Sequence, residues 1–368
     1  MRILMLANNF EDLTIQLANA LYDKGITVCI FLINQPSEDL DQSGAFNVEV
    51  ESYRYIQPRL FDPSNILLQY RLYKKIIEFQ PDIIHSQGLN HWFSLTLPFF
   101  KLKQIPVIIT FHDPKPHKGE NFIRRRIADY LGRLFAEAVF VHGENLKDLM
   151  IKEYGYPSSK IHVISLGEQQ VAPFLRFFDN RITEERNIIL FFGRIFAYKG
   201  LEFLIKAEPL ISKEIPDARI IIAGTGENFK KYEDMMVNKD HFEVHNYQIP
   251  YKQGAELFQK CSLVVLPYID ASQSGVIHTA YGFKKPVIVT NVGSIPEIVD
   301  DTVTGIIVPP GDPKALADAI VNLLNNDLLR HQMGINGYFK LKNDLSWESI
   351  SKNIIEIYQE VIDKQTKE

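Results

Sequence analysis

The stretch "NIILFFGRIFAYKG", residues 187–200, decides the fold of this chain. Its first part, Ile188–Phe192, is a short continuous apolar run, which is typical of a parallel strand covered by helices on both faces. The run ends at Gly193, and apolar residues at helical spacing begin directly after the stretch. A strand, a loop and a helix in this order predict an α/β domain. Arg194 and Lys199 then lie at the carboxyl end of the strand, where open α/β sheets bind ligands.

A second stretch of the same kind strengthens the prediction of a ligand site. The apolar run Cys261–Leu266 is followed by the polar loop "PYIDASQSG" and by an apolar segment of helical length, residues 276–283. Gly275 allows a ligand to approach the backbone, and the free N–H groups of a helix start favour an anion. We therefore expect a phosphate-binding site for a nucleotide. Solvated loop cations are the alternative reading of Arg194 and Lys199.

Strands and helices alternate along the whole chain. Ile3–Ala7, Leu13–Tyr22 and Ile26–Ile33 read as strand, helix and strand, which makes a βαβ unit and begins a parallel sheet. The terminal segment Trp347–Ile362 has an amphipathic helical pattern. We expect two Rossmann-like domains, a linker and a terminal helix, with the boundaries 1–170, 171–186, 187–345 and 346–368.

Composition limits the class of protein. The chain has 368 residues, of which 46% are hydrophobic and 23% charged, so it can build the cores of about two domains. A net charge of −5 argues against a nucleic-acid binder. Cys29 and Cys261 lie in apolar runs, where buried and reduced thiols are expected, so we expect a cytoplasmic protein. The first residues, "MRILMLANN", are too short an apolar run for a signal peptide, and no apolar window approaches the roughly 18 residues of a membrane span.

Four motifs together resemble a known family. They are Gly-Arg-x4-Lys-Gly at 193–200, Ala-Gly-x-Gly at 223–226, "SGVIHTAYGFKKPVIVTNVGSIPEIV" at 274–299 and "TGIIVPPGD" at 304–312. In order and spacing they resemble the donor-binding half of the family 4 retaining, nucleotide-sugar-dependent glycosyltransferases. The resemblance implies the GT-B fold, in which two Rossmann-like domains face each other across a cleft and the C-terminal helix crosses back to the first domain. It also implies a nucleotide-sugar co-substrate and no separate cofactor.

The resemblance assigns roles to most of the candidate site. Arg194, Lys199 and the N–H groups of Ser274, Gly275 and Val276 would stabilise the departing diphosphate as preorganised donors, with no metal required. Gly193 and Gly224 belong to the glycine turns of the motifs that resemble the donor site. His112 matches a histidine that faces the donor sugar, although a structural role for this histidine is an equally open reading.

The chain departs from the family at two positions. Many relatives carry two glutamates eight positions apart, whereas Ala271 and Thr279 stand here. Asp270 could replace the first carboxylate, and Thr279 offers a hydroxyl to the ribose in place of the second. Gln273 and Ser274 could take over contacts with the sugar. This departure leaves the donor sugar and the nucleobase open.

A basic segment suggests a further partner. Residues 101–133 hold eight cations against the three anions Asp113, Glu120 and Asp129. Such a patch could face anionic lipid headgroups or a lipid pyrophosphate acceptor, or it could be a solvated helix face. The cations are Lys101, Lys103, Lys115, Lys118, Arg124, Arg125, Arg126 and Arg133.

The preferred hypothesis is a retaining glycosyltransferase of surface polysaccharide or glycolipid synthesis. It would move a sugar from a nucleotide-sugar to a saccharide or lipid-linked acceptor. We expect it to work in the cytoplasm, with the inner face of the membrane as the alternative location. One alternative is a nucleotide-sugar epimerase, which would act without an acceptor. A phosphorylase would need a pyridoxal lysine, for which no surrounding motif is recognisable. The third reading is a degenerate, non-catalytic nucleotide-sugar-binding subunit.

Overall fold

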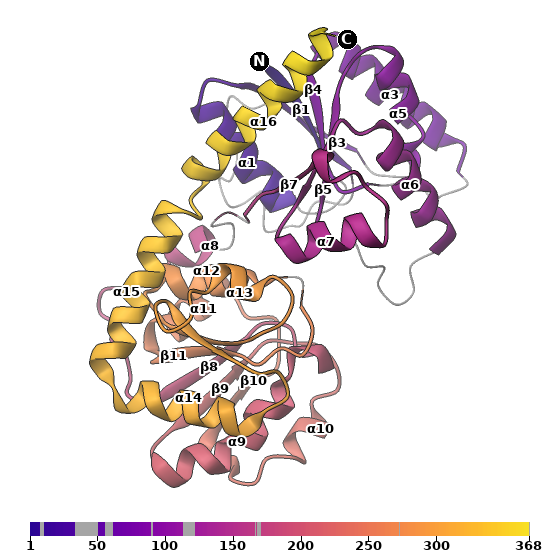
Figure 1. Cartoon of the computed structure of the whole chain (residues 1–368). Helices are drawn as coiled ribbons and strands as arrows, with labels where there is room; N and C mark the ends of the chain where they lie inside the picture. Colours follow the sequence, from indigo (N-terminus) through magenta and orange to yellow (C-terminus); the bar gives the residue numbers. More distant parts are fainter. Residues whose placement is uncertain are drawn as a thin grey trace. The chain divides into compact units, whose positions relative to one another are not determined.

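The computed structural model consists of two compact units, each with its own parallel sheet (Figure 1). The first unit comprises Met1–Gly167 and Trp347–Glu368, and the second comprises Glu168–Ser346. The structure describes residues 1–7, 11–33, 51–55, 62–89, 91–112, 122–165, 167, 171–271 and 273–367. Two parallel-sheet α/β domains are present, which confirms the predicted fold class.

The sheet of the first unit has the strand order β3-β2-β1-β4-β5-β6-β7 in the described part of the chain, and all neighbours are parallel. Alternate residues of each strand face opposite layers of helices, so that Leu4 and Leu6 lie in one core and Ile3 and Met5 in the other. The strands are β1 (Arg2–Ala7), β2 (Thr27–Ile33), β3 (Glu51–Tyr55), β4 (Ile83–Gln87), β5 (Val107–Phe111), β6 (Ala138–Val141) and β7 (Ile161–Val163).

Two layers of helices cover this sheet. One layer contains α1 (Glu11–Asp23) and α16 (Trp347–Lys367), which contact each other. The tyrosine Tyr358 of α16 is fully buried and bonds the ring of His85 in β4 at 2.5 Å, so the end of the chain is part of the first unit. The other layer contains α3 (Ser64–Phe79), α4 (His91–Ser94), α5 (Leu97–Leu102), α6 (Phe122–Phe135) and α7 (Glu144–Lys152).

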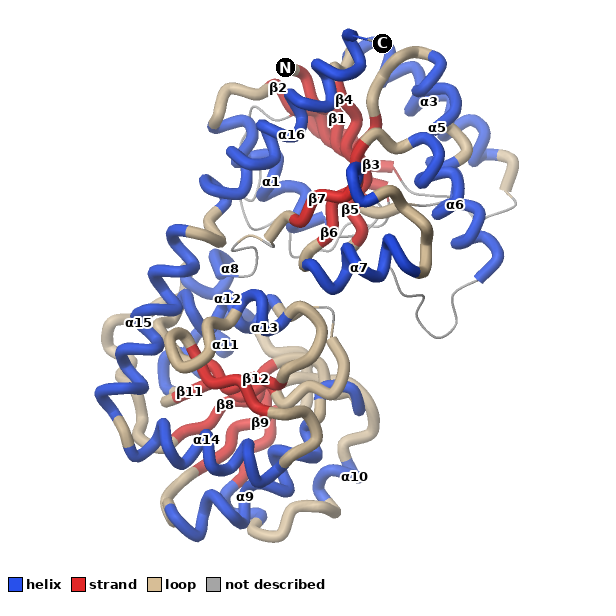
Figure 2. The backbone as a smooth tube through the Cα atoms, viewed as in Figure 1, coloured by secondary structure: helices blue, strands red, loops and turns tan. Residues whose placement is uncertain are grey.

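The second unit repeats the design with the strand order β10-β9-β8-β11-β12-β13, again parallel throughout. Figure 2 draws the strands of this sheet in red among blue helices. The deciding apolar run is β8 (Ile188–Phe192), a parallel strand as predicted, and it lies in the middle of this sheet. The other strands are β9 (Arg219–Ala223), β10 (Phe242–His245), β11 (Leu263–Leu266), β12 (Val287–Thr290) and β13 (Gly305–Val308).

Helices cover both faces of the second sheet and enclose two apolar cores. The start of α14 (Pro313–Asn325) shows the local cause of one helix, because the Asp312 carboxylate accepts from the N–H groups of Lys314 and Ala315. The remaining helices are α8 (Val171–Leu175), α9 (Leu201–Glu214), α10 (Lys230–Glu233), α11 (Tyr251–Lys260), α12 (Gly275–Gly282), α13 (Ile295–Ile298) and α15 (Asp327–Asn343).

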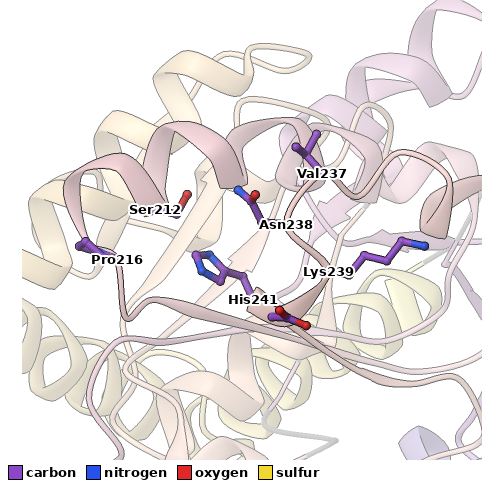
Figure 3. A pocket seen from close by; sticks show the side chains of 7 residues that line it. Ser212, Pro216, Val237, Asn238, Lys239 and His241 are labelled. Carbon is purple, nitrogen blue, oxygen red and sulfur yellow. The ribbon is translucent and has the colours of Figure 1, made fainter.

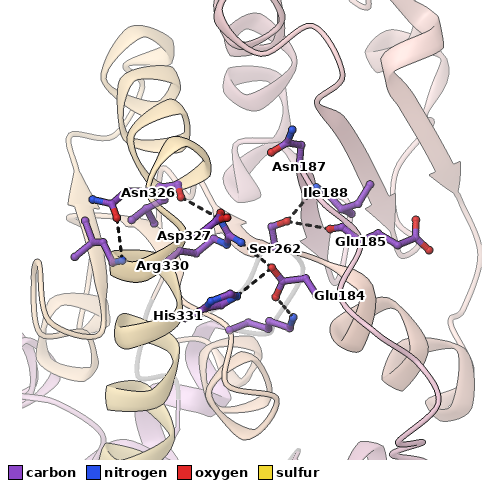
Figure 4. Close-up of polar contacts among 12 residues, drawn as sticks. Glu184, Glu185, Asn187, Ile188, Ser262, Asn326, Asp327, Arg330 and His331 are labelled. Atoms are coloured by element: carbon purple, nitrogen blue, oxygen red, sulfur yellow. Dashed lines mark hydrogen bonds and ion pairs between the residues drawn. The ribbon is translucent and has the colours of Figure 1, made fainter.

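The predicted linker, residues 171–186, folds instead as part of the second unit. Val171 and Phe174 of α8 are buried in its core. The Glu184 carboxylate accepts from the buried Lys285 ammonium at 2.6 Å and from the buried Arg330 guanidinium at 2.9 Å (Figure 4). The five-residue helix α8 is too short to show a helical period in the sequence. Local composition also does not show that other segments pack over it.

Candidate functional site

The backbone beyond β8 and β9 forms the floor of the candidate site in the second unit. The Gly193 N–H donates to the Ala223 carbonyl at 2.9 Å, and Gly224 follows with a φ of +153°. A Cβ atom on Gly224 would lie 1.8 Å from the Gly193 oxygen, so only glycine allows the backbone after β9 to lie this close to the backbone after β8. Both glycines of the predicted site therefore meet at one point of the sheet edge.

The cationic loop is attached to the end of β11. Gly200 has a φ of +66°, and a Cβ atom there would lie 1.8 Å from the Pro267 oxygen. The Ile269 N–H donates to the Tyr198 carbonyl at 2.9 Å. The close approach that Gly200 permits brings Lys199 to Tyr268, the residue that follows Pro267 and lies far from Lys199 in the sequence.

Lys199 lies against an aromatic ring. Its Nζ is 3.6 Å from the centroid of the Tyr268 ring, which is a cation–π contact. Tyr268 is 1% exposed, and its hydroxyl bonds the Ser274 Oγ at 3.1 Å. Burial, and secondly the neighbouring Arg194 guanidinium, lower the pKa of Lys199 to about 7. The site thus holds a desolvated amine next to a permanent cation.

The amino end of α12 lies opposite this floor. A Cβ atom on Gly193 would lie 3.8 Å from a methyl carbon of Val276, the second residue of the helix. Ser274 is the N-cap residue, but its hydroxyl bonds Tyr268 rather than the helix backbone. Helix starts carry free N–H groups and a positive dipole end, so this arrangement can bind an anion beside Gly193.

The remaining predicted residues differ in accessibility. Asp270 is exposed and Gln273 half-buried, in the loop between β11 and α12. Thr279 is 1% exposed, and its hydroxyl donates to the Gly275 carbonyl at 3.3 Å. This placement argues against the expected contact of Thr279 with a ribose, because the hydroxyl is already bonded inside the helix.

Tyr268 is the site residue that the sequence analysis missed. It follows Pro267 directly at the end of an apolar run, so it was placed at the correct edge of the sheet. An aromatic residue there gives no local sign that a lysine from another loop lies on its ring. Its contact with Lys199 depends on the packing of Gly200 against Pro267.

His112 belongs to the first unit, whereas the other ten predicted site residues belong to the second. Its Nδ1 lies 3.1 Å from the Nε2 of His142, and the Nδ1 of His142 lies 2.8 Å from the Ile164 carbonyl. A carbonyl only accepts, so His142 carries its proton on Nδ1 and accepts from the Nδ1–H of neutral His112. The Nε2 of His112 is then the unprotonated nitrogen, so it can only accept a hydrogen bond. It lies 2.8 Å from the Gln87 Oε1, so the Gln87 side-chain amide must be flipped to place its NH2 group there as the donor.

Burial keeps this histidine group neutral. Burial, and secondly the neighbouring His142, lower the pKa of His112 well below its ordinary value. Burial also lowers the pKa of His142 to about 4 and, with His142 nearby, that of His85 to about 3. His85 bonds Tyr358 and Thr110 and has the packing role of a core histidine.

A separate hollow of about 500 Å³ lies at the opposite edge of the second sheet (Figure 3). It is formed where α9 ends and where β10 begins, away from the carboxyl strand ends. Its lining residues are Ser212, Pro216, Val237, Asn238, Lys239, Asp240 and His241. Among the described residues, no group of three or more His, Cys, Asp or Glu side chains is placed to hold a metal ion.

Comparisons with known proteins give relatives of this chain. An uncharacterized glycosyltransferase of Methanocaldococcus jannaschii is 32% identical over 48% of this chain and 49% of its own length, so the chain spans about half of it. D-inositol 3-phosphate glycosyltransferase of Pseudarthrobacter chlorophenolicus is 25% identical over 95% of this chain and 89% of its own. The solved structure of Anabaena HepE in complex with UDP shares the fold, with a TM-score of 0.75 at 16% identity over 98% of this chain and 100% of that one.

Two family models match the chain, one in each unit. The model of glycosyltransferase family 4 matches residues 11–167 in the first unit. The model of glycosyl transferases group 1 matches residues 175–340 in the second. Together they span most of the sequence, and the chain therefore belongs to the group 1 glycosyltransferases of family 4.

Proposed function

We propose that the chain transfers a sugar, with retention, from a nucleotide-sugar to a saccharide or lipid-linked acceptor in surface polysaccharide or glycolipid synthesis. One observation carries the proposal: the desolvated amine of Lys199 lies on Tyr268, beside Arg194 and at the sheet edge that α12 approaches. A desolvated cation next to another cation is unfavourable by itself, and a diphosphate would remove that penalty. Ligand binding would thus restore the charge of Lys199.

The proposed chemistry needs charge balance and no separate cofactor. The bond between the anomeric carbon and the diphosphate oxygen breaks, and its electron pair leaves with the diphosphate. Arg194, Lys199 and the N–H groups of Gly275 and Val276 would balance the charge that develops on that oxygen. The acceptor hydroxyl forms the new bond on the side of the leaving group and gives its proton to the departing diphosphate. The scheme uses no metal.

Contacts with the sugar are proposed for the loop before α12. We propose that Asp270 and Gln273 bind sugar hydroxyls, since both side chains are at least partly accessible. Ser274 would act through Tyr268, which it bonds. His112 would serve the transfer step as a neutral imidazole whose tautomer is set by His142.

The test is nucleoside diphosphate release by purified protein with donor and acceptor. Arg194→Ala and Lys199→Ala should each lower turnover by roughly 100- to 1,000-fold, the usual loss for one donor to a developing anion. Lys206→Ala is the matched control, because Lys206 is an exposed cation of α9 that pairs only with Glu202 among the ion pairs described. Full turnover in both site variants would refute the phosphate assignment. Uridine diphosphate sugars come first in a thermal-shift panel because Anabaena HepE was solved with UDP.

The residues Ala271 and Thr279 favour one alternative, a nucleotide-sugar-binding subunit without catalysis, because neither supplies a carboxylate. Nucleotide binding by calorimetry without any turnover across an acceptor panel would support that alternative. A nucleotide-sugar epimerase would instead convert the donor with no acceptor present, which a simple incubation detects.

We further propose that the protein works in the cytoplasm, in peripheral contact with an anionic membrane. No helix in the described ranges combines the length and the apolar character that membrane crossing requires. The residues predicted for the contact are partly outside the description: Lys115 and Lys118 lie outside the described residues, and Arg124, Arg125 and Arg126 are described in their backbone alone.

A further inference from the structure

Among the side chains that the structure describes in the first unit, one helical layer exposes large apolar residues and the other does not. Among the described side chains of this unit nine such residues are exposed, and all of these lie in residues 64–79, 91–105 and 122–135, which we call the α3–α6 face. Where side chains are described, α1 and α16 expose none. The nine are Ile66, Leu67, Tyr70, Ile77, Leu95, Leu102, Ile127, Tyr130 and Leu134.

The exposed side chains form stripes that the fold does not use. On α3 the core stripe is Leu68, Leu72, Ile76 and Phe79, whereas Ile66, Tyr70 and Ile77 repeat at helical spacing on a second stripe. Ile66 and Tyr70 are 68% and 61% exposed. A helix that needs only one apolar stripe for its core has a second one here, and such a stripe marks an interaction surface.

The stripes lie on one continuous layer. Tyr73 of α3 contacts Phe99 of α5 edge to face at 4.7 Å, and α4 and α5 both contact α6. Figure 1 shows α3, α5 and α6 side by side. On α6 the exposed residues Ile127, Tyr130 and Leu134 also repeat at helical spacing.

The two layers also differ in charge. The α3–α6 face contains nine cations and only the anions Glu78 and Asp129, while α1 and α16 contain seven anions and three cations. The whole chain has a net charge of −5, so the cations are concentrated on the apolar layer. They are Arg71, Lys74, Lys75, Lys101, Lys103, Arg124, Arg125, Arg126 and Arg133, of which Lys101 pairs with Glu137 just beyond the face.

We propose that the α3–α6 face is the surface by which this protein docks on an anionic lipid bilayer. Headgroups would take the lysines and arginines, and the exposed stripes would enter the boundary between headgroups and acyl chains. A second copy of the chain fits less well, because a two-fold interface would bring nine cations against nine. The proposal deepens the membrane contact proposed above and is independent of the transfer chemistry.

The test is co-sedimentation with vesicles of phosphatidylcholine alone and of phosphatidylcholine mixed with phosphatidylglycerol. We expect binding to the anionic vesicles only, weakened by salt. Arg71→Gln with Lys103→Gln should lower the affinity by roughly tenfold or more, since each cation near an anionic surface contributes about fivefold. Tyr70→Ser with Leu102→Ser should lower it similarly, and because both side chains are exposed the fold should be retained.

Matched variants elsewhere separate docking from general effects. Lys352→Gln with Lys364→Gln removes two cations of α16, and Leu328→Ser with Phe339→Ser removes two exposed apolar side chains of the second unit. Both should bind vesicles as the wild type does. The proposal is overturned if the wild type does not bind anionic vesicles, or if face and control variants lose the same affinity. It is also overturned if the protein does not bind vesicles but self-associates, and the face variants abolish that self-association. Nucleotide binding measured in the same variants tests the transferase proposal separately.

Discussion

The lowered pKa of Lys199 predicts that donor binding takes up a proton. In the free protein, burial and Arg194 hold this pKa at about 7, so the amine is largely neutral above that pH. A bound diphosphate favours the ammonium and should return the pKa toward its ordinary value of about 10.4. Affinity for the nucleotide-sugar is therefore expected to fall as the pH rises from 7 toward that value.

The size of the effect follows from the two pKa values. At pH 8 about 90% of the free lysine is neutral, so each binding event should take up about 0.9 proton. Between pH 6 and pH 9 the dissociation constant should rise by about 100-fold, because each pH unit above the pKa of Lys199 in the unliganded protein raises it about tenfold. A nucleotide-sugar carries no phosphate group that titrates in this range, so the protein causes the dependence.

Calorimetry of UDP-sugar binding at pH 8, in two buffers with different ionisation enthalpies, measures the proton uptake directly. Lys199→Arg is the control, since a guanidinium stays charged and should bind with little pH dependence and no uptake. Arg194→Gln removes one cause of the shift and should move the midpoint of the dependence to higher pH. A wild-type affinity that stays constant from pH 6 to pH 9, without proton uptake, would refute the reasoning.

Three further predictions concern the framework of the site. Gly200→Ala should cost more than about 3 kcal/mol in unfolding free energy, whereas Gly311→Ala, at a φ of +75° but with only a 3.8 Å contact to a side chain, should cost about 1–2 kcal/mol in denaturant titrations. Glu184→Ala should cost about 3–5 kcal/mol, because it removes the acidic partner of buried Lys285 and one of the two acidic partners of buried Arg330, which keeps Asp327. Glu185→Ala, in exposed pairs, should cost less than about 1 kcal/mol, and equal losses would contradict the buried network. The buried histidines have lower pKa values in the folded than in the unfolded chain, so the free energy of unfolding should fall as the pH drops from about 6.5 to 4. His142→Gln removes one of these groups and should reduce the change of unfolding free energy with pH by about 1.4 kcal/mol per pH unit in denaturant titrations.

The sequence alone determined the elements that depend on local pattern. Continuous apolar runs identified β8 and β11 as buried parallel strands, and the residues that follow them were correctly placed at the carboxyl edge of one sheet. Gly193 and Gly200 could be singled out because they belong to the Gly-Arg-x4-Lys-Gly motif, and both have a positive φ in the structure. These features need no knowledge of distant segments, since strand pattern and backbone freedom are properties of neighbouring residues.

Only the tertiary structure decided which surfaces are covered, and with them the chemistry of the site. The low pKa of Lys199 arises from burial and from the neighbouring Arg194, and the Thr279 hydroxyl is buried and bonded to the Gly275 carbonyl inside α12. Val171 belongs to a core although its segment reads as a linker, while Tyr70 repeats at helical spacing and yet stays exposed. Periodicity shows that a stripe is apolar, but desolvation depends on what packs against it, and those contacts come from residues far away in the chain.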